Sequence, residues 1–399
     1  MTAIVLFWVF FALALYPFVI YPALLGLLAL GARRPKRDES YTPKVSVVVA
    51  AWNEEALISR RLDNLLASDY PEDRLEIIIA SDGSTDRTNE IVAEYAERDG
   101  RVRLLALEHH GKTPTVNAGV AAATGDVVIS SDAGTAFAED TIRKLAAPFA
   151  DEAVDCVVGE LNMVPVEDAP YNRGEGAYWR FEAWLRYLES RAGVGFQGCG
   201  PCMAIRREEY PTLPGEGSDD LSAPLQIAHA GGRVIQLMDV GVTDYMDGGT
   251  GNQMQSRCRR VVRALRSISY SAGALNPFRC PRTAFAIISH KILRWLTGIW
   301  MLGMLVTSAW LWWREDILLY DALFYAQAAF YLLALMGYLL SNTRLAKNPV
   351  LSVPLAICIV ALAFLGGIIE FLRGRSYATW QPTASGAAEP DQTGTDEKK

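Results

Sequence analysis

Cysteine and histidine are scarce in this sequence, which has 6 Cys and 4 His among 399 residues. Four of the 6 cysteines have no close cysteine partner, which favours reduced thiols over a disulfide framework. Cys199 and Cys202 spell Cys-Gly-Pro-Cys, but their flanks are rich in glycine, whereas a thioredoxin-like redox site needs a strand before it and a helix after it. The histidines lack the spacing of metal ligands, so neither zinc nor redox chemistry is indicated: His109, His110, His229 and His290.

An excess of positive charge is also absent, because 38 Lys and Arg stand against 45 Asp and Glu, for a net charge of −7. Binding to a phosphate backbone requires a basic face, so we expect no nucleic acid partner. Hydrophobic residues make up 51% of the chain, which is high for a soluble protein of this size. The composition therefore predicts membrane-spanning segments. It does not indicate the oligomeric state.

Charged residues are missing from the whole of residues 3–31, an apolar stretch long enough to cross a bilayer core about 30 Å thick. Basic residues follow this stretch at 33–37 instead of preceding it, which argues against a signal peptide. Basic residues favour the cytoplasmic side. We therefore expect an N-terminal transmembrane helix over residues 1–31 and a basic linker over residues 32–43, with the chain from about Tyr41 onward beginning in the cytoplasm.

Three further apolar spans are expected near the carboxyl end, at about residues 293–313, 317–340 and 350–371. Four spans with an external amino end would place the carboxyl end outside as well. Arg373 and Arg375 nevertheless follow the last span, and such residues prefer the cytoplasm. Either this bias fails here or one apolar stretch does not cross. The expected segments of this half are an interfacial segment at 266–292, transmembrane helices within 293–373, and a polar, disordered tail at 374–399.

Between the apolar ends, short apolar runs alternate with amphipathic stretches, which predicts a mostly parallel sheet with helices on both faces. Ligands of such folds bind at the carboxyl ends of the strands. After this region we expect an aromatic helix and then a loop-rich stretch with one helix. The strands are expected at 45–51, 75–80, 102–107 and 126–130, the helices at 54–67, 85–97, 113–123, 178–189 and 221–230, and the loop-rich stretch at 193–251.

Polar clusters follow three of these strands, at Asn53-Glu54-Glu55, at residues 81–84 and at residues 131–134. A single Asp-Gly is usually only a turn. Three polar clusters at the carboxyl edge of one parallel sheet instead predict a site for a nucleotide or phosphate.

With these motifs the chain resembles the family 2 glycosyltransferases, in the membrane-bound branch that includes cellulose, chitin and hyaluronan synthases. The resemblance covers about residues 44–265, and it implies an α/β GT-A fold, Rossmann-like, joined to transmembrane helices. The implied enzyme is an integral protein of the cell membrane, with a cytoplasmic catalytic domain over residues 44–265. The matching segments are Val45 to Glu55, Ala80 to Thr85, Gly111-Lys112, Asn117-Ala118-Gly119, Ser131-Asp132-Ala133, Gly198-Cys199-Gly200 and Ser218-Asp219-Asp220.

The resemblance implies inverting transfer of a hexosyl or N-acetylhexosaminyl group from a nucleotide-sugar, expected to be a UDP-sugar, to a polysaccharide or lipid-linked acceptor among the membrane lipids. Asp220 looks like the general base, which takes the proton of the acceptor hydroxyl. Asp132 looks like the ligand of a Mg²⁺ or Mn²⁺ ion. The other implied contacts with the nucleotide-sugar are Asn53, Glu55, Asp82, Lys112, Arg260 and Arg263, and the implied acceptor region comprises Gly198, Cys199, Gly200, Asp219 and Trp179.

Two departures from the family pattern limit this interpretation. Gly134 stands where the metal-binding Asp-x-Asp motif has its second aspartate, so a second metal ligand is not identified. Arg257 and Val261 stand where the Gln and Trp of the processive synthases are expected, which puts polymer synthesis in doubt. The alternatives are transfer of a single sugar to a membrane lipid and a nucleotide-binding membrane protein without transfer activity. Asp219 and Asp220 can also serve as helix-capping residues, and Arg260 and Arg263 as a membrane anchor.

Overall fold

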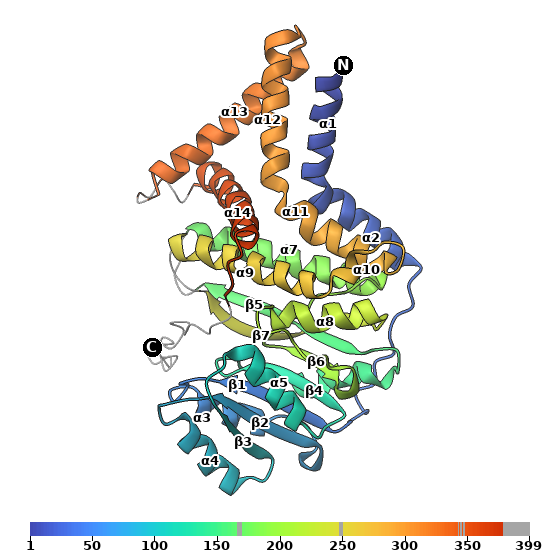
Figure 1. The fold of residues 1–399 in the computed structure, drawn as a ribbon, viewed down its shortest axis with the longest axis vertical. Coiled ribbons are helices and arrows are strands. Elements are labelled where there is room, and N and C mark those ends of the chain that lie inside the picture. Colours follow the sequence, from blue (N-terminus) through green and yellow to red (C-terminus); the bar gives the residue numbers. More distant parts are fainter. Residues whose placement is uncertain (166–169, 247–249, 342, 344, 346–347, 378–399) are drawn as a thin grey trace, which may run out of the picture.

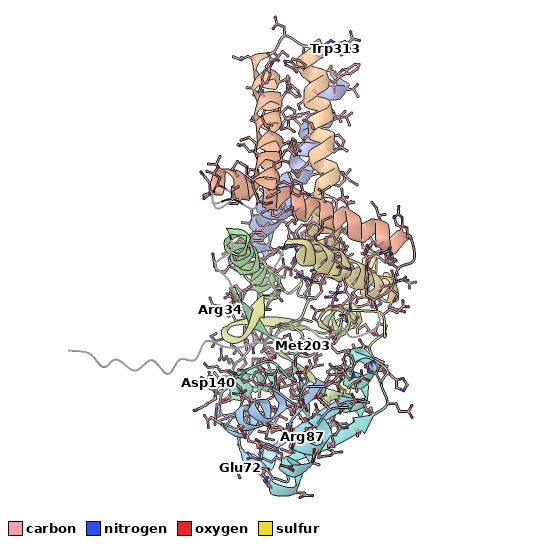
Figure 2. The ribbon with its side chains drawn as sticks, turned by 90° about the vertical axis from the view of Figure 1, so that its left-hand side faces the viewer. Arg34, Glu72, Arg87, Asp140, Met203 and Trp313 are labelled. Carbon is pink, nitrogen blue, oxygen red and sulfur yellow. The ribbon has the colours of Figure 1, made fainter. Side chains whose placement is uncertain are left out.

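The computed structural model describes residues 1–165, 170–246, 250–341, 343, 345 and 348–377, with the side chains of residues 161–179 and 243–253 outside the description. A sheet with its flanking helices forms one end of the elongated molecule, and apolar helices form the other (Figure 1). Trp313 lies at the tip of the helical end, and Glu72 lies at the opposite end (Figure 2). The fold is therefore an α/β body joined to a helical region, as the sequence predicts.

The sheet has seven strands in the order β3-β2-β1-β4-β6-β5-β7. The half that contains β3, β2, β1 and β4 is parallel throughout. The short strand β6 runs antiparallel to both of its neighbours, while β5 and β7 are parallel to each other. The strands are β1 (Val45–Ala51), β2 (Leu75–Asp82), β3 (Val102–Leu107), β4 (Val127–Asp132), β5 (Cys156–Pro165), β6 (Met203–Arg206) and β7 (Val234–Met246).

The central strands form because their apolar, often β-branched residues can be buried on both faces. Every residue of β1 is buried. Close packing of α5 against β1 is possible because position 119 is glycine, where a Cβ atom would lie 2.4 Å from Cγ1 of Val48. The first four predicted strands and the helices between them are confirmed, with small shifts of their ends. These helices are α3 (Ile58–Leu66), α4 (Thr88–Arg98) and α5 (Lys112–Ala122); α6 (Thr141–Ala146) follows β4 and was not predicted.

The expectation of a loop-rich stretch over residues 193–251 is wrong in part, because β6 and β7 lie within it. Neither strand has the simple apolar run of the central strands. Strand β6 has only 4 residues. The pairing of β7 with β5 is irregular, because its register shifts between Val158 and Glu160 of β5. The Nε2 group of the buried Gln236 in β7 donates to the carbonyl oxygen of Gly159 at 2.8 Å. Polar residues inside these buried strands interrupt the apolar pattern, so the sequence did not predict this half of the sheet.

The helical region contains helices long and apolar enough to cross a membrane. Within the described part of the chain these are Thr2–Leu30, Leu318–Leu339 and Pro349–Leu372, and a fourth results if the pair Pro281–Trp295 and Thr297–Arg314, bent by 57°, counts as one span. The elements are α1 (Thr2–Leu15), α2 (Tyr21–Leu30), α7 (Pro170–Ala192), α8 (Asp219–Ala230), α9 (Thr250–Tyr270), α10 (Pro281–Ile287), α11 (Leu293–Trp295), α12 (Thr297–Arg314), α13 (Leu318–Leu339) and α14 (Pro349–Leu372).

Helix α14 packs along α9, which carries the basic segment near the site. The Cys258 thiol donates to the carbonyl oxygen of Ala363 at 3.2 Å, and a Cβ atom on Gly367 would lie 2.6 Å from Cβ of Val261. Figure 2 shows α14, at the red end of the colour scale, lying across the direction of α12. The last apolar helix is thus fastened to the α/β body.

Candidate active site

The loops after β1 and β2 hold each other through side-chain hydrogen bonds. Asn53 has a left-handed backbone (φ 56°), and its Oδ1 accepts from the Thr85 N–H at 2.8 Å. The Asn53 N–H donates to Ser84 Oγ at 3.1 Å, and Glu55 Oε2 accepts from the Arg87 N–H at 3.1 Å. Asn53 and Glu55 therefore shape this edge of the sheet, and both are exposed to solvent. Their contacts with a nucleotide stay a prediction.

Asp82 ends β2 and organises the turn that leads into α5. Its fully buried carboxylate accepts the backbone N–H groups of His110 at 2.8 Å and Gly111 at 2.9 Å. Gly111 has φ 95°, a conformation that disfavours any residue with a side chain. The His109 ring stacks on Trp52, with the ring centroids 4.8 Å apart. Asp82 thereby places Lys112 at the start of α5, and its predicted nucleoside contact remains untested.

Lys112 joins two of the predicted carboxylates. Its Nζ lies 2.7 Å from Oδ1 of Asp132 and 3.3 Å from Oδ2 of Asp219, although these residues come from different strands and helices. Burial acts to lower the pKa of Lys112, but the two negative charges outweigh it and raise that pKa. Arg263 approaches Asp219 from α9, with Nη2 and Oδ1 3.8 Å apart. Four predicted site residues thus meet in one ionic cluster.

The position of Asp219 in this cluster determines its charge. Burial acts to raise its pKa, but Lys112 and then Arg263 lower it below the usual range. Asp219 is therefore ionised at neutral pH. Its contacts place it beside Lys112, where the resemblance implies the donor diphosphate.

The surroundings of Asp132 suit a divalent cation completed by phosphate oxygens. Glu54 lies close enough for the charge of Asp132 to act on it, and burial, then Asp132 and Asp86, raise the pKa of Glu54 to about 7. An added Cβ at Gly134 would meet only Cδ1 of Leu57, at 3.8 Å. No group of three or more potential metal-ligating side chains is found in the described part of the chain. Carboxylate oxygens of this kind fit Mg²⁺ or Mn²⁺ if the donor supplies further oxygens.

The glycine-rich loop predicted as the acceptor region packs directly on the start of α8. The Gly198 N–H donates to the carbonyl oxygen of Asp220 at 2.7 Å, and a Cβ on Gly198 would lie 2.7 Å from that same oxygen. At Gly200 an added Cβ would lie 3.6 Å from Asp219 Oδ2. The Ser218 hydroxyl donates to Oδ1 of Asp220. Glycine at these positions lets the loop approach both carboxylates.

The Cys-Gly-Pro-Cys segment forms part of the core. Cys199 and Cys202 are free thiols and are buried. Burial raises the pKa of Cys199 to about 12, which keeps it protonated and unreactive at neutral pH. The remaining four cysteines are also free. The absence of a disulfide framework predicted from the sequence is thus in accord with the structure.

A cavity of about 140 Å³ lies on the Asp220 side of α8. Arg260 lines this cavity, whereas Arg263 belongs to the Lys112 cluster, so the two arginines predicted to act together lie in different surroundings. The side chain of Trp179, also predicted for the acceptor region, lies outside the described residues. The lining residues that the argument below uses are Glu182, Arg186, Asp220, Arg257, Arg260, Lys291, Arg294, Trp295 and Phe364.

Sequence reasoning missed several of these lining residues because they come from helices outside the matching motifs. Glu182 in α7 lies in a buried network, with Oε2 accepting from Arg294 Nη1 at 2.6 Å and Oε1 lying 3.1 Å from His290 Nε2. The sequence offered one signal for these lining residues, namely charged residues on the aromatic face of α7 and beside the apolar span. Glu54 was missed although it stands between two residues that were chosen.

Comparison with known proteins agrees with the motifs. Residues 46–211 match the model of the glycosyl transferase family 2. An N-acetylglucosaminyltransferase of Rhizobium meliloti (strain 1021) is 26% identical over 289 residues, which cover 67% of this chain and 68% of that protein. A beta-monoglucosyldiacylglycerol synthase of Nostoc sp. is 27% identical over 212 residues, covering 51% of this chain and 45% of that protein. The chain thus spans between about half and two thirds of these relatives.

The fold has a counterpart among solved structures. The mannosyltransferase PcManGT from Pyrobaculum calidifontis, in complex with GDP-Man and Mn²⁺, aligns with a TM-score of 0.67 at 22% sequence identity. The alignment covers 94% of this chain and 98% of that protein, so it includes the helical region as well as the sheet. The family match identifies residues 46–211 as a glycosyl transferase family 2 domain, and the named relatives and the GT-A fold agree with that match.

Proposed function

We propose that this glycosyltransferase moves a hexosyl or N-acetylhexosaminyl group from a nucleotide-sugar, a UDP-sugar by the resemblance, to a lipid or lipid-linked acceptor at the cytoplasmic membrane face, with inversion at the anomeric carbon. The relatives named as an N-acetylglucosaminyltransferase and a beta-monoglucosyldiacylglycerol synthase support this range of sugars and acceptors. The structural relative in complex with GDP-Man and Mn²⁺ shares the fold only, so it does not select the nucleotide.

The observation that carries the proposal is that two adjacent carboxylates, Asp219 and Asp220, lie in different surroundings. Asp219 contacts Lys112 and Arg263, next to Asp132, where a donor diphosphate is expected. Asp220 follows it directly and lines the cavity, where an acceptor is expected. A general base of a displacement reaction has to stand between the two substrates. The start of α8 provides that position.

Asp220 then acts on the acceptor hydroxyl. It takes the hydroxyl proton as the oxygen attacks the anomeric carbon, and the nucleoside diphosphate leaves from the opposite side. Lys112 and Arg263 supply positive charge near the expected position of the diphosphate. The Ser218 hydroxyl orients the carboxylate of Asp220 through its hydrogen bond to Oδ1.

A divalent cation fits this scheme at Asp132, with Glu54 beside it. When bound, it would neutralise the charge that develops on the diphosphate. Lys112 already contacts Oδ1 of Asp132 at 2.7 Å, which fixes the orientation of the carboxylate.

Removal of divalent cations by a chelator tests whether sugar transfer requires a metal ion. We expect excess chelator to abolish sugar transfer, and added Mn²⁺ or Mg²⁺ to restore it. Gly134→Asp supplies the missing carboxylate in open space and is expected to lower the Mn²⁺ concentration for half-maximal activity roughly tenfold. Full activity in excess chelator contradicts the role of Asp132 in metal binding.

The packing of α14 supports a membrane topology with three crossings. Residues 2–30, the bent pair that ends at Arg314, and α13 cross, while α14 lies at the membrane surface against α9. Its contacts with Val261 and Cys258 on α9 support this position. With three crossings, Arg373 and Arg375 fall on the cytoplasmic side, in agreement with the preference of positive residues.

A reporter at the carboxyl end tests this topology. Green fluorescent protein fused after the last residue is expected to fluoresce, because it folds in the cytoplasm, whereas alkaline phosphatase fused there is expected to be inactive. The same two reporters fused to the amino end serve as a control and are expected to give the opposite pattern. An active phosphatase at the carboxyl end contradicts the surface position of α14.

The function itself is tested with purified full-length protein in lipid nanodiscs. Radiolabelled UDP-glucose, UDP-N-acetylglucosamine and GDP-mannose are supplied in separate reactions, and the products are sized. We expect a single sugar on a lipid instead of a polymer, because Val261 offers no aromatic platform for a growing chain. A long polymer contradicts that choice, and the absence of any transferred label contradicts the proposed function.

A further inference from the structure

Among the described residues, cationic side chains outnumber carboxylates around the cavity beside Asp220. Five cationic side chains line it, against the two carboxylates Glu182 and Asp220. Arg294 donates to Glu182 at 2.6 Å, and the charged neighbours outweigh burial to hold the pKa of Glu182 well below its usual range. The five cations are Arg186, Arg257, Arg260, Lys291 and Arg294.

Three of the arginines are themselves buried around this cavity. Arg186 is 8% exposed, Arg257 is 5% exposed and Arg294 is 2% exposed. Nη1 of Arg186 donates to the Gly198 carbonyl at 3.0 Å, while its Nε atom is buried without a hydrogen-bond acceptor among the described residues. The planar guanidinium presents a fork of N–H donors, which suits an oxyanion such as phosphate that can accept two hydrogen bonds.

Aromatic side chains of the helical region also line the cavity. Trp295 ends α11, and Phe364 comes from α14, the helix that packs along α9. Both are buried. A ligand that fills this cavity therefore meets cations and aromatic side chains at once, as an amphipathic lipid headgroup would.

This cation cluster is separate from the expected donor site. Lys112 and Arg263 meet at Asp219, which does not line the cavity, whereas the five cations surround Asp220. The strand ends that hold Asn53 and Asp82 also lie on the donor side. The charge in the cavity is thus placed to meet the acceptor.

From this arrangement we infer that the acceptor is a membrane lipid whose headgroup carries a phosphate next to the hydroxyl that receives the sugar. The inference rests on the proposed function and specifies its substrate. The hydroxyl oxygen forms a bond to the anomeric carbon, and the bond from that carbon to the nucleoside diphosphate breaks. The hydroxyl proton passes to Asp220, and the bonding electron pair leaves with the diphosphate. The cations hold the lipid phosphate.

Nanodiscs of different composition test this inference with the full chain. Phosphatidylcholine discs contain either phosphatidylglycerol, which has a phosphate beside hydroxyls, or diacylglycerol, which has a hydroxyl only. Two further reactions supply glycerol 3-phosphate or chitobiose in solution. With the labelled donors above, we expect at least tenfold more label in phosphatidylglycerol than in diacylglycerol or glycerol 3-phosphate. Because the protein is embedded in every disc, lipid charge cannot act by recruiting it.

Variants that remove one positive charge from α9 test whether the cavity is the site that binds the lipid phosphate. Arg257→Gln is expected to lower kcat/KM for phosphatidylglycerol at least tenfold while leaving the donor KM unchanged. Arg257→Lys keeps the charge and is expected to recover most of the activity. Arg259→Gln removes an equal charge from the same helix outside the cavity and is expected to behave like the unaltered protein.

The outcomes separate the two proposals. Equal labelling of diacylglycerol and phosphatidylglycerol, or label only in chitobiose, overturns the phosphate-bearing acceptor and leaves the proposed function intact. Equal labelling of glycerol 3-phosphate overturns the requirement for a lipid. No transferred label in any arm overturns both proposals. An Arg257→Gln variant with unchanged kcat/KM for phosphatidylglycerol overturns the assignment of the cavity.

Discussion

Asp220→Asn is expected to lower the rate of sugar transfer about 10³-fold while donor binding stays close to normal. General bases contribute roughly 10² to 10⁴ in rate, and the amide cannot take the proton of the acceptor hydroxyl. The substitution keeps the shape of the side chain, and its oxygen can still accept from Ser218. Transfer is measured as labelled product, and donor binding as the Kd of the nucleotide-sugar in the absence of acceptor.

Glu216→Gln is the matched control, because it removes a carboxylate from the same loop at a partly exposed position, 3.5 Å from Arg266 Nε. We expect this variant to transfer sugar at the normal rate. An Asp220→Asn variant with nearly normal turnover would show that another group accepts the proton. A lost affinity for the donor would instead place Asp220 in the donor site.

Lys112→Gln is expected to reduce kcat/KM for the donor by roughly 10² to 10³, the usual cost of removing one preorganised charge near a developing anion. Lys112 contacts both Asp132 and Asp219, so its loss also leaves these two carboxylates without this cation, at the position where the diphosphate is expected. The thermal midpoint of unfolding is expected to fall, since a buried carboxylate loses a partner. Initial rates over a range of donor concentrations measure the catalytic effect.

Lys144→Gln provides the comparison for Lys112. Lys144 also pairs with a carboxylate, at 2.6 Å from Asp140, but this pair lies at the start of α6, and the Asp140 side chain is half-exposed. We expect neither the donor KM nor the thermal midpoint to change appreciably, because exposed pairs contribute little. If Lys112→Gln behaves in the same way, the ionic cluster has no part in donor binding.

The parallel half of the sheet was predictable because its strands are continuous apolar runs and its polar residues come immediately after them. Val45 to Ala51 shows this pattern most clearly, and all seven residues are buried. The other half of the sheet was not predictable from the same signal. In β7, Gln236 and the irregular pairing with β5 interrupt the apolar pattern, and the structure compensates with hydrogen bonds that the sequence does not reveal.

The residues of the candidate site were likewise only partly predictable from the sequence. Asp132, Lys112 and Asp219 were found from motifs, since each stands at the end of a predicted strand or the start of a predicted helix. Their mutual contacts depend on the folded arrangement of β4, α5 and α8. Arg186 and Lys291 could not be found in this way, because they join Asp220 only through the docking of α7 and the helical region. Motifs therefore indicated the residues of the ionic cluster, although Asp219 was predicted for the acceptor region, and they missed most of the charged residues that line the cavity.

Phe364 on α14 closes a cavity whose charged residue Asp220 lies far earlier in the chain. During synthesis on the ribosome, the sheet and the donor cluster are therefore complete while the last apolar helix is still to emerge. The wall of this cavity is complete only when α14 has been synthesised and has packed on α9. The surroundings of Asp220 therefore depend on the last helix of the described chain.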